Sequence, residues 1–337
     1  MESNGKKNQE TVQAESSENI TVVNQTEVSN SGEAVLKAPL TRKEKAKEIW
    51  RNNWEGWIFT LPLTIGLLLF TVYPMIQSLI WSFHQYTGMT YKFNGFENFV
   101  HIFTQNKDFW RVFANTCYYT FVSVPLSLVA SYLLACLVNM KIKAVGAFRV
   151  LYYLPTVIPG VVSGILWKDM FGPAGFFNEI IGVFGAHSEF FDSAEWTIAI
   201  SSIFLMNMWG IGGGMILWLS AFKSIPTQLY EAARIDGASR FRCLINITIP
   251  MSMTMIFFNV VTMLIGTLQY NGTLTFATGG TGYNNSLYML GVMIYNYAFT
   301  KSAFGYASAL SWVLMIFIAL ITAIIFGLRR FVYMGDE

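Results

Sequence analysis

The sequence predicts an all-α integral membrane protein with six transmembrane helices, and three observations support this. Hydrophobic residues make up 53% of the 337 residues and charged residues only 12%, with a mean hydropathy of +0.43. Ordinary soluble domains carry roughly 25% charged residues. Six apolar runs are each long enough to cross a bilayer, which takes about 20 helical residues. These runs are continuous rather than alternating, which argues against a β-barrel.

The six runs give the expected spans. Helices satisfy their own backbone groups, so each run is expected to cross the membrane as a helix. The expected spans are Ile58–Phe83, Cys117–Met140, Val150–Phe171, Thr197–Phe222, Met253–Tyr270 and Tyr306–Phe326.

Charge at the ends of the runs predicts their orientation, because Lys and Arg favour the cytoplasmic side. One side carries Arg42, Lys43, Lys45, Lys47, Arg51, Lys141, Lys143, Arg149, Lys223, Arg234, Arg240, Arg242, Arg329 and Arg330. The other side carries only Lys92, Lys107, Arg111, Lys168 and Lys301. The first side is therefore expected to be cytoplasmic, with both termini inside the cell.

Domain organisation follows from the same patterns. Residues 1–40 are rich in Ser, Asn, Glu, Gln and Thr, which predicts a disordered cytoplasmic tail. Residues 41–57 form an amphipathic cytoplasmic lead-in. Residues 58–330 form the transmembrane domain, with a cytoplasmic loop at 223–252, and residues 331–337 form a short cytoplasmic tail.

Several functional classes are disfavoured. The net charge of +2 and the absence of a basic stripe interleaved with aromatics argue against a nucleic-acid partner. No apolar run carries Asp, Glu, Lys or Arg in its middle, which weakens the case for an ion-coupled transporter. Gly210 and the run Gly212–Gly214 lack the lysine of a phosphate-binding loop, so we expect no ATP hydrolysis, no catalytic residue and no metal site in this chain.

Two spans carry residues that interrupt helices. The glycines of the fourth run predict close helix packing and a bend at mid-membrane. Pro155 and Pro159 predict a break in the third run, and broken helices tend to line cavities.

The loop 223–252 contains EAARIDGASRFRCLINITIP, which is amphipathic and charged. Pro226 suits the first turn of a short helix, and Gly237 can adopt the left-handed backbone that ends it. Ser239 can then cap a second helix. The side-by-side alanines, next to Glu231 and Arg234, suit close approach of a partner. A loop that packs against the protein's own inner face is an equally open interpretation.

YEAARIDGAS followed by ITIP resembles the EAA loop of permease subunits of ABC importers, and is similar to the carbohydrate (maltose-type) branch of that family. FRVLYYLPTVIPGVVSGILWKDMFGPAGFF and YNYAFTKSAFGYASALS resemble other segments of its first permease. One departure is Thr281-Gly282, where the family often has Gly-Pro. The resemblance implies the MetI-like type I importer permease fold in a bacterial inner or plasma membrane.

The resemblance also implies partners and roles. A second permease, a cytoplasmic ABC ATPase dimer and an extracytoplasmic sugar-binding protein are expected, together with membrane lipid. ATP and Mg would be bound by the partner ATPase, with no cofactor in this chain. The residues expected to couple the chain to the ATPase are Glu231, Ala232, Ala233, Arg234, Asp236 and Gly237.

A sugar path needs polar groups beside flat apolar faces. The candidates are Asn207, Trp209, Asn259, Gln269, Tyr270 and Asn271. Asn207, in FLMNMW, resembles a sugar-contacting asparagine of the family. For each of these residues an interhelical hydrogen bond is the competing interpretation.

The resulting hypothesis is a non-catalytic permease subunit of an ATP-driven, binding-protein-dependent importer for a sugar or oligosaccharide. An ion-coupled secondary transporter and a non-transporting membrane scaffold are the alternatives.

Overall fold

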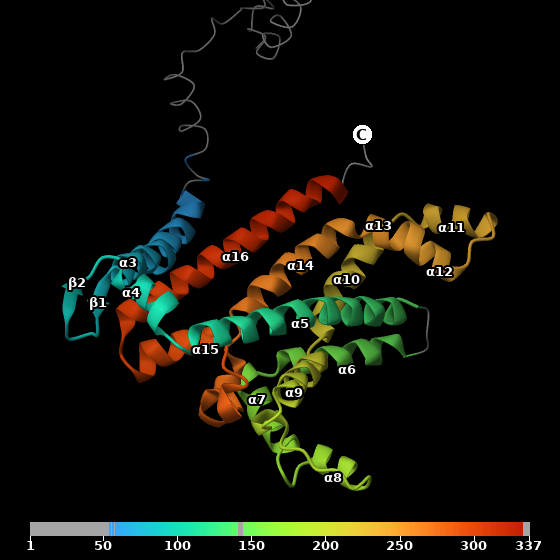
Figure 1. Ribbon diagram of the computed structural model, residues 1–337. Coiled ribbons are helices and arrows are strands. Elements are labelled where there is room, and N and C mark those ends of the chain that lie inside the picture. The colour runs from blue at the N-terminus through green and yellow to red at the C-terminus, as the bar shows by residue number, and fades with distance from the viewer. Residues whose placement is uncertain (1–53, 55, 57, 141–143, 333–337) are drawn as a thin grey trace, which may run out of the picture. The chain divides into compact units, whose positions relative to one another are not determined.

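The computed structural model describes residues 54, 56, 58–140 and 144–332, and it divides between Tyr73 and Pro74 into two units (Figure 1). The expected 1–40 tail and nearly all of the 41–57 lead-in lie outside the described residues, as does most of the 331–337 tail. In the first unit the described chain is helical and includes the π-helical turn η1, Leu68–Val72. Its side chains are largely exposed, with Phe59 and Phe70 above 80%, as suits a helix in lipid.

All six expected spans are present as helices or bent helix pairs that are long and apolar enough to cross a membrane. Three are unbroken: Ile58–Ser82, α5 (Phe109–Val138) and Phe304–Gly327, which lies within α16 (Phe304–Val332). Three are bent pairs: α6 (Val145–Val157) with α7 (Gly160–Met170) at 98°, α9 (Trp196–Trp209) with α10 (Gly212–Ser224) at 49°, and Arg240–Met251 with α14 (Met253–Leu268) at 68°.

The predicted breaks are confirmed at Pro159 and in the fourth span, but not at Pro155, which lies inside the continuous helix α6. Pro159 has no N–H and pushes Ile158 into an extended conformation, so α6 ends at Val157. In the fourth span the helix breaks at Gly210, and Gly212 then lies directly against the backbone carbonyl of Tyr152 in α6. The two broken spans therefore meet beside their break points, where only a glycine leaves room.

Several predicted boundaries need correction. The second span begins at Phe109 rather than Cys117, because Phe109, Val112 and Thr116 are buried at its N-terminal end. The third span begins at Val145 rather than Val150, the fourth ends at Ser224 rather than Phe222, and the sixth begins at Phe304 rather than Tyr306. The fifth span ends at Leu268 rather than Tyr270.

The all-α prediction missed a small β-hairpin. Strand β1 (His84–Tyr86) pairs antiparallel with β2 (Tyr91–Phe93), with His84 opposite Phe93. Asn98 holds the hairpin by donating from Nδ2 to the carbonyls of Ser82 and His84, at 2.8 and 3.0 Å. Strands of three residues are too short to show an alternating pattern, so the sequence did not indicate them.

Short elements connect the spans or, within Ile58–Ser82 and Arg240–Met251, form part of them. They are α3 (Tyr73–Ser82), α4 (Glu97–Val100), η2 (His101–Gln105), α8 (Phe176–Gly182), η3 (Phe190–Asp192), α11 (Thr227–Ile235), α12 (Arg240–Cys243), η4 (Leu244–Thr248), α13 (Ile249–Met251), η5 (Gly272–Thr275), η6 (Thr278–Gly280), η7 (Tyr283–Asn285), α15 (Leu290–Tyr295) and η8 (Asn296–Thr300).

The loop between α14 and α16 is tied to the N-terminal end of α5. Asn115 Nδ2 donates to the carbonyl of Tyr288 at 3.2 Å, and its Oδ1 accepts from Trp196 Nε1 at 3.0 Å. The amide of Leu290 donates to Thr116 Oγ1 at 2.9 Å. These bonds hold together segments that lie far apart in the sequence.

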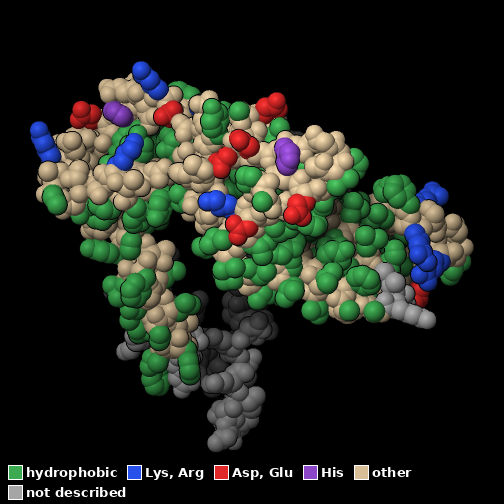
Figure 2. Space-filling view, turned by 90° about the horizontal axis from the view of Figure 1, so that it is seen from below, with side chains coloured by type: hydrophobic (Ala, Val, Ile, Leu, Met, Phe, Trp, Pro, Cys, Tyr) green, Lys and Arg blue, Asp and Glu red, His purple; other side chains and the backbone are tan. Residues whose placement is uncertain are grey.

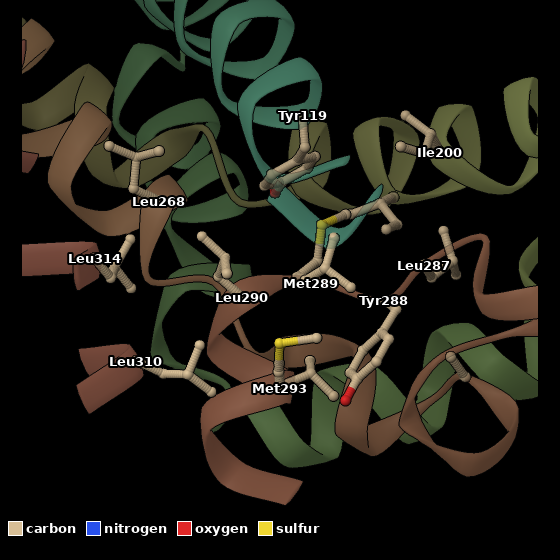
Figure 3. Packing of buried hydrophobic residues seen from close by; sticks show 14 of the residues in the cluster. Tyr119, Ile200, Leu268, Leu287, Tyr288, Met289, Leu290, Met293, Leu310 and Leu314 are labelled. Atoms are coloured by element: carbon tan, nitrogen blue, oxygen red, sulfur yellow. The ribbon is translucent and has the colours of Figure 1, made fainter. Parts of the chain in front are cut away.

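Helix α5 is the centre of the second unit and packs against α9, α10, α14 and α15. Figure 3 shows its Tyr119 among buried side chains of the neighbouring elements, including Leu268, Met289 and Leu310. Toward its other end α5 contributes Ala135 to a second cluster around the fully buried Trp218 of α10. In lipid, such close packing and interhelical hydrogen bonds hold helices together, because the surrounding tails are as apolar as the side chains.

Candidate functional site

The loop 223–252 folds as the local sequence signals predict. Helix α10 ends at Ser224, and Pro226 directly precedes the first residue of α11, with an extended ψ of 128°. Only Ile225 and Pro226 separate the two helices. A movement of α11 therefore has almost no flexible chain through which to dissipate before it reaches α10.

A tight turn joins α11 to α12. Gly237 has φ of +75°, the left-handed conformation expected for it, and the amide of Ala238 donates to the carbonyl of Ala233 at 2.8 Å. Ser239 is the N-cap of α12 as predicted, because its Oγ accepts from the amide of Arg242 at 3.2 Å. The glycine and the serine thus end one helix and begin the next within three residues.

The loop is anchored to the bundle from one side only. Tyr230 OH lies 3.0 Å from Thr248 Oγ1, and Ser252 Oγ donates to the carbonyl of Thr248 at 2.7 Å. Ser252 in turn lies 3.2 Å from Tyr132 OH of α5. This chain of polar contacts connects α11 to the longest span.

The other side of α11 is exposed. The residues expected to couple the chain to an ATPase are exposed except for the half-buried Ala233, and the helix has no buried residue. Ile235 is 87% exposed. This geometry argues against a loop that packs on the protein's own inner face. Figure 2 shows Lys and Arg side chains gathered at this end of the unit.

A cavity of about 280 Å³ lies among α5, the α9–α10 break and α14. Most of its polar lining is hydroxyl or amide. The lining consists of Tyr119, Ser123, Val124, Ser127, Ser131, Asn207, Gly210, Ile211, Gly214, Met263, Gly266, Thr267 and Tyr270.

Two of the predicted path residues line this cavity. Asn207 Nδ2 donates to Tyr119 OH at 2.6 Å and to the carbonyl of Ile203 at 3.0 Å. The rings of Tyr119 and Tyr270 lie 5.0 Å apart between centroids, and the Tyr270 hydroxyl is buried without a hydrogen-bond partner among the described residues. For Asn207 the interhelical hydrogen bond and the cavity position coexist.

The other four predicted path residues do not line the cavity. The Trp209 ring packs against Trp167 at 5.8 Å. Asn259 is buried, and its Nδ2 donates to the carbonyl of Met255 one turn earlier in its own helix, at 2.9 Å. Gln269 and Asn271 are exposed beyond the end of α14.

Sequence reasoning missed the α5 wall of the cavity. Tyr119, Ser123, Ser127 and Ser131 recur at every fourth position, so they share one face of the helix. That repeat of hydroxyls in an apolar span was the available signal. Toward the C-terminal end of α5, Ser131 Oγ accepts from Trp218 Nε1 at 3.0 Å, and the close approach of Gly214 completes the wall.

Comparison with known proteins assigns the chain to a family. Residues 99–333 match the family described as the binding-protein-dependent transport system inner membrane component. A probable ABC transporter permease protein, YesP, of Bacillus subtilis is 32% identical and covers 84% of this chain and 93% of its own length. The lactose transport system permease protein LacF of Rhizobium radiobacter is 32% identical over 86% and 98% of the two chains. The multiple sugar-binding transport system permease protein MsmF of Streptococcus mutans is 30% identical over 81% and 94%.

The fold is also known from solved structures. A chain of a bacterial ABC transporter involved in the import of the acidic polysaccharide alginate superposes with a TM-score of 0.75. It is 22% identical, and the match covers 87% of this chain and all of that one. The predicted permease fold is therefore confirmed.

Proposed function

Because this chain belongs to the family of binding-protein-dependent transport system inner membrane components, we propose that it forms half of the membrane path of an ATP-driven importer for a sugar or oligosaccharide. The observation that carries the proposal is the direct connection between an exposed, rigid α11 and a polar cavity. Helix α10 joins the two, with Gly214 in the cavity wall and Ser224 next to the loop.

The cavity suits a sugar. Hydroxyls and an amide can exchange hydrogen bonds with a polyol, and the faces of Tyr119 and Tyr270 offer flat apolar surface. Relatives named for lactose and for multiple sugars, both at least 30% identical, support the same substrate class.

The exposed face of α11 would dock a cytoplasmic ABC ATPase dimer. Ala232 and Ala233 leave space for close approach, while Glu231, Arg234 and Asp236 offer fixed charges, and Gly237 makes the turn. ATP and Mg would be bound by that partner, and hydrolysis would occur there, so this chain would be non-catalytic. Closure of the ATPases would move α11 as a rigid helix, and the short connection to α10 would pass the motion to the cavity.

The remaining surface has room for a second permease and lipid. Helices α6 and α7 expose large apolar side chains along their length, among them Val150, Leu151 and Val157, each above 60%. A homologous permease would cover part of this surface and complete the path, and lipid would cover the rest. A sugar-binding protein would deliver the substrate at the outer end of a bacterial inner or plasma membrane, with both termini of this chain in the cytoplasm.

The proposal is tested by purifying the tagged chain from its native membrane in mild detergent. We expect mass spectrometry to identify a second permease and an ABC ATPase in the eluate. ATP hydrolysis should rise when a co-encoded binding protein loaded with sugar is added. A lone chain that stays stable through purification and brings no ATPase would contradict the proposal and return the secondary transporter and the scaffold to consideration.

A further inference from the structure

We propose that the cavity selects neutral saccharides and excludes those that carry carboxylate or sulfate groups. This inference rests on the proposed function, because it concerns which sugars pass along the same path. A shared fold does not determine this property, since substrate recognition depends on the side chains of the site.

The first argument is charge. Every residue in the described lining of the cavity is uncharged. An anionic group inside the hydrocarbon region is unfavourable unless a cation or several hydrogen-bond donors compensate it. A neutral sugar loses only hydrogen bonds to water, and polar groups of the lining can replace them.

The second argument is the direction of the available hydrogen bonds. Ser131 Oγ donates to the carbonyl of Leu128 at 3.1 Å, and Thr267 Oγ1 donates to that of Met263 at 2.9 Å. The amide nitrogen of Asn207 is engaged by Tyr119 and Ile203. Thr267 and Asn207 therefore present mainly oxygen lone pairs to a ligand, whereas Ser131 is fully buried and its oxygen already accepts from Trp218.

Oxygen lone pairs in the lining interact differently with neutral and with acidic sugars. A sugar hydroxyl can donate to them, whereas a carboxylate has only acceptors and would meet repulsion. The lining also keeps a donor: the Ser127 hydroxyl has no hydrogen-bond partner among the described residues and can donate to a ring or hydroxyl oxygen of a neutral ligand. The lining thus complements a molecule that has both hydrogen-bond donors and acceptors and carries no charge.

The test uses the complete importer, with its partner subunits and binding protein, in proteoliposomes with internal ATP. It is offered size-matched neutral oligosaccharides from starch, galactan, xylan and chitin together with acidic ones from pectin and alginate. Imported sugars are identified by mass spectrometry. We expect neutral sugars to accumulate at least about tenfold over acidic ones, the factor that 1.4 kcal/mol of discrimination gives. Import of acidic sugars would overturn this inference while leaving the importer standing, and import of no sugar would overturn the proposed function itself.

A second experiment asks whether this chain's cavity makes the selection. Ser127 lies in the α5 wall of the cavity. Ser127→Lys and Ser127→Asp place opposite charges there, and Ser127→Met adds comparable bulk without charge. Both charged variants should import the neutral sugar at least about tenfold more slowly than Ser127→Met. Only Ser127→Lys should begin to admit the acidic sugar.

The matched set separates charge from damage to the fold, since all variants must first co-purify with the partners at wild-type levels. If Ser127→Lys does not assemble, Thr267→Lys against Thr267→Met asks the same question from α14. Equal import by the charged and uncharged variants of an assembled pair would overturn the inference.

Discussion

The loop 223–252 and the cavity differ in how their structure arises. In the loop, each turn and cap is made by residues within a few positions of one another, such as Ser239 and Arg242. In the cavity, the contacting residues lie far apart in the sequence, such as Tyr119 and Asn207. The loop is exposed, whereas the cavity is lined by helices that pack against one another within this chain.

Because of this difference, we expect substitutions in the loop and in the cavity wall to have different effects. A substitution in the exposed loop should affect coupling and leave folding nearly unchanged. A substitution in the cavity wall should disturb helix packing as well as transport, because its residues also hold spans together. The following variants test that separation, beginning with the largest expected effect.

Glu231→Lys should abolish most import without reducing the amount of protein in the membrane. The side chain is exposed on α11, so the fold does not depend on it, but reversing its charge at an interface should lower uptake by about tenfold or more. Uptake of labelled sugar, normalised to membrane level, measures the effect. Gln228→Lys on the same exposed helix is the control. Wild-type uptake by Glu231→Lys at normal expression would count against the coupling role.

Gly212→Ala should destabilise the protein by about 1–3 kcal/mol, because a Cβ at this position would collide with the Tyr152 carbonyl and lie 3.1 Å from the Tyr153 amide. Thermal unfolding in detergent should show a lower midpoint. Gly146→Ala in α6 is the matched control, since nothing lies within 4 Å of its Cβ. Equal midpoints for the two variants would show that the breaks of the two spans do not pack as described.

Tyr119→Phe should destabilise the protein by about 1 kcal/mol, because it removes the 2.6 Å hydrogen bond from Asn207. Sugar uptake should also fall, since the cavity wall loses a hydroxyl. Tyr118→Phe, one residue away on the exposed side of α5, should change neither quantity. If the two variants behave alike, the hydrogen bond does not organise the cavity.

Ser239→Ala should have the smallest effect, a local loss of about 1 kcal/mol at the start of α12. Amide hydrogen exchange in the loop should speed up while the spans stay protected. Ser239→Asp preserves a capping oxygen and should restore slow exchange. Unchanged exchange in Ser239→Ala would mean that the contacts of Tyr230 and Thr248 alone hold the loop.

The features that the sequence predicted correctly depend on local contacts, and most of those that it missed depend on contacts between distant residues. The six spans, the breaks near Pro159 and Gly210 and the turn at Gly237 were predicted, because each depends on nearby residues or on a long apolar run. The cavity was predicted only at Asn207 and Tyr270. Trp209 and Asn259 have suitable chemistry, but Trp167 and Met255 engage them instead, and only the packed structure shows that.

The β-hairpin and the hydroxyl face of α5 were missed for different reasons. Strands of three residues have too little sequence to carry a pattern, and their pairing depends on the anchor at Asn98. The repeat from Tyr119 to Ser131 was visible, but a serine in an apolar helix can also bond its own backbone. Which face looks into a cavity depends on the neighbouring spans.

The buried hydrogen bond from Trp218 to Ser131 fixes α10 against α5 at one point along its length. The helix has 13 residues and is therefore about 20 Å long. Gly214 lies about 6 Å from Trp218 along the axis and Ser224 about 9 Å on the other side. If α10 tilts as a stiff rod about that point, a displacement of its loop end moves its cavity end in the opposite direction. The cavity end then moves through roughly two-thirds of the distance that the loop end moves.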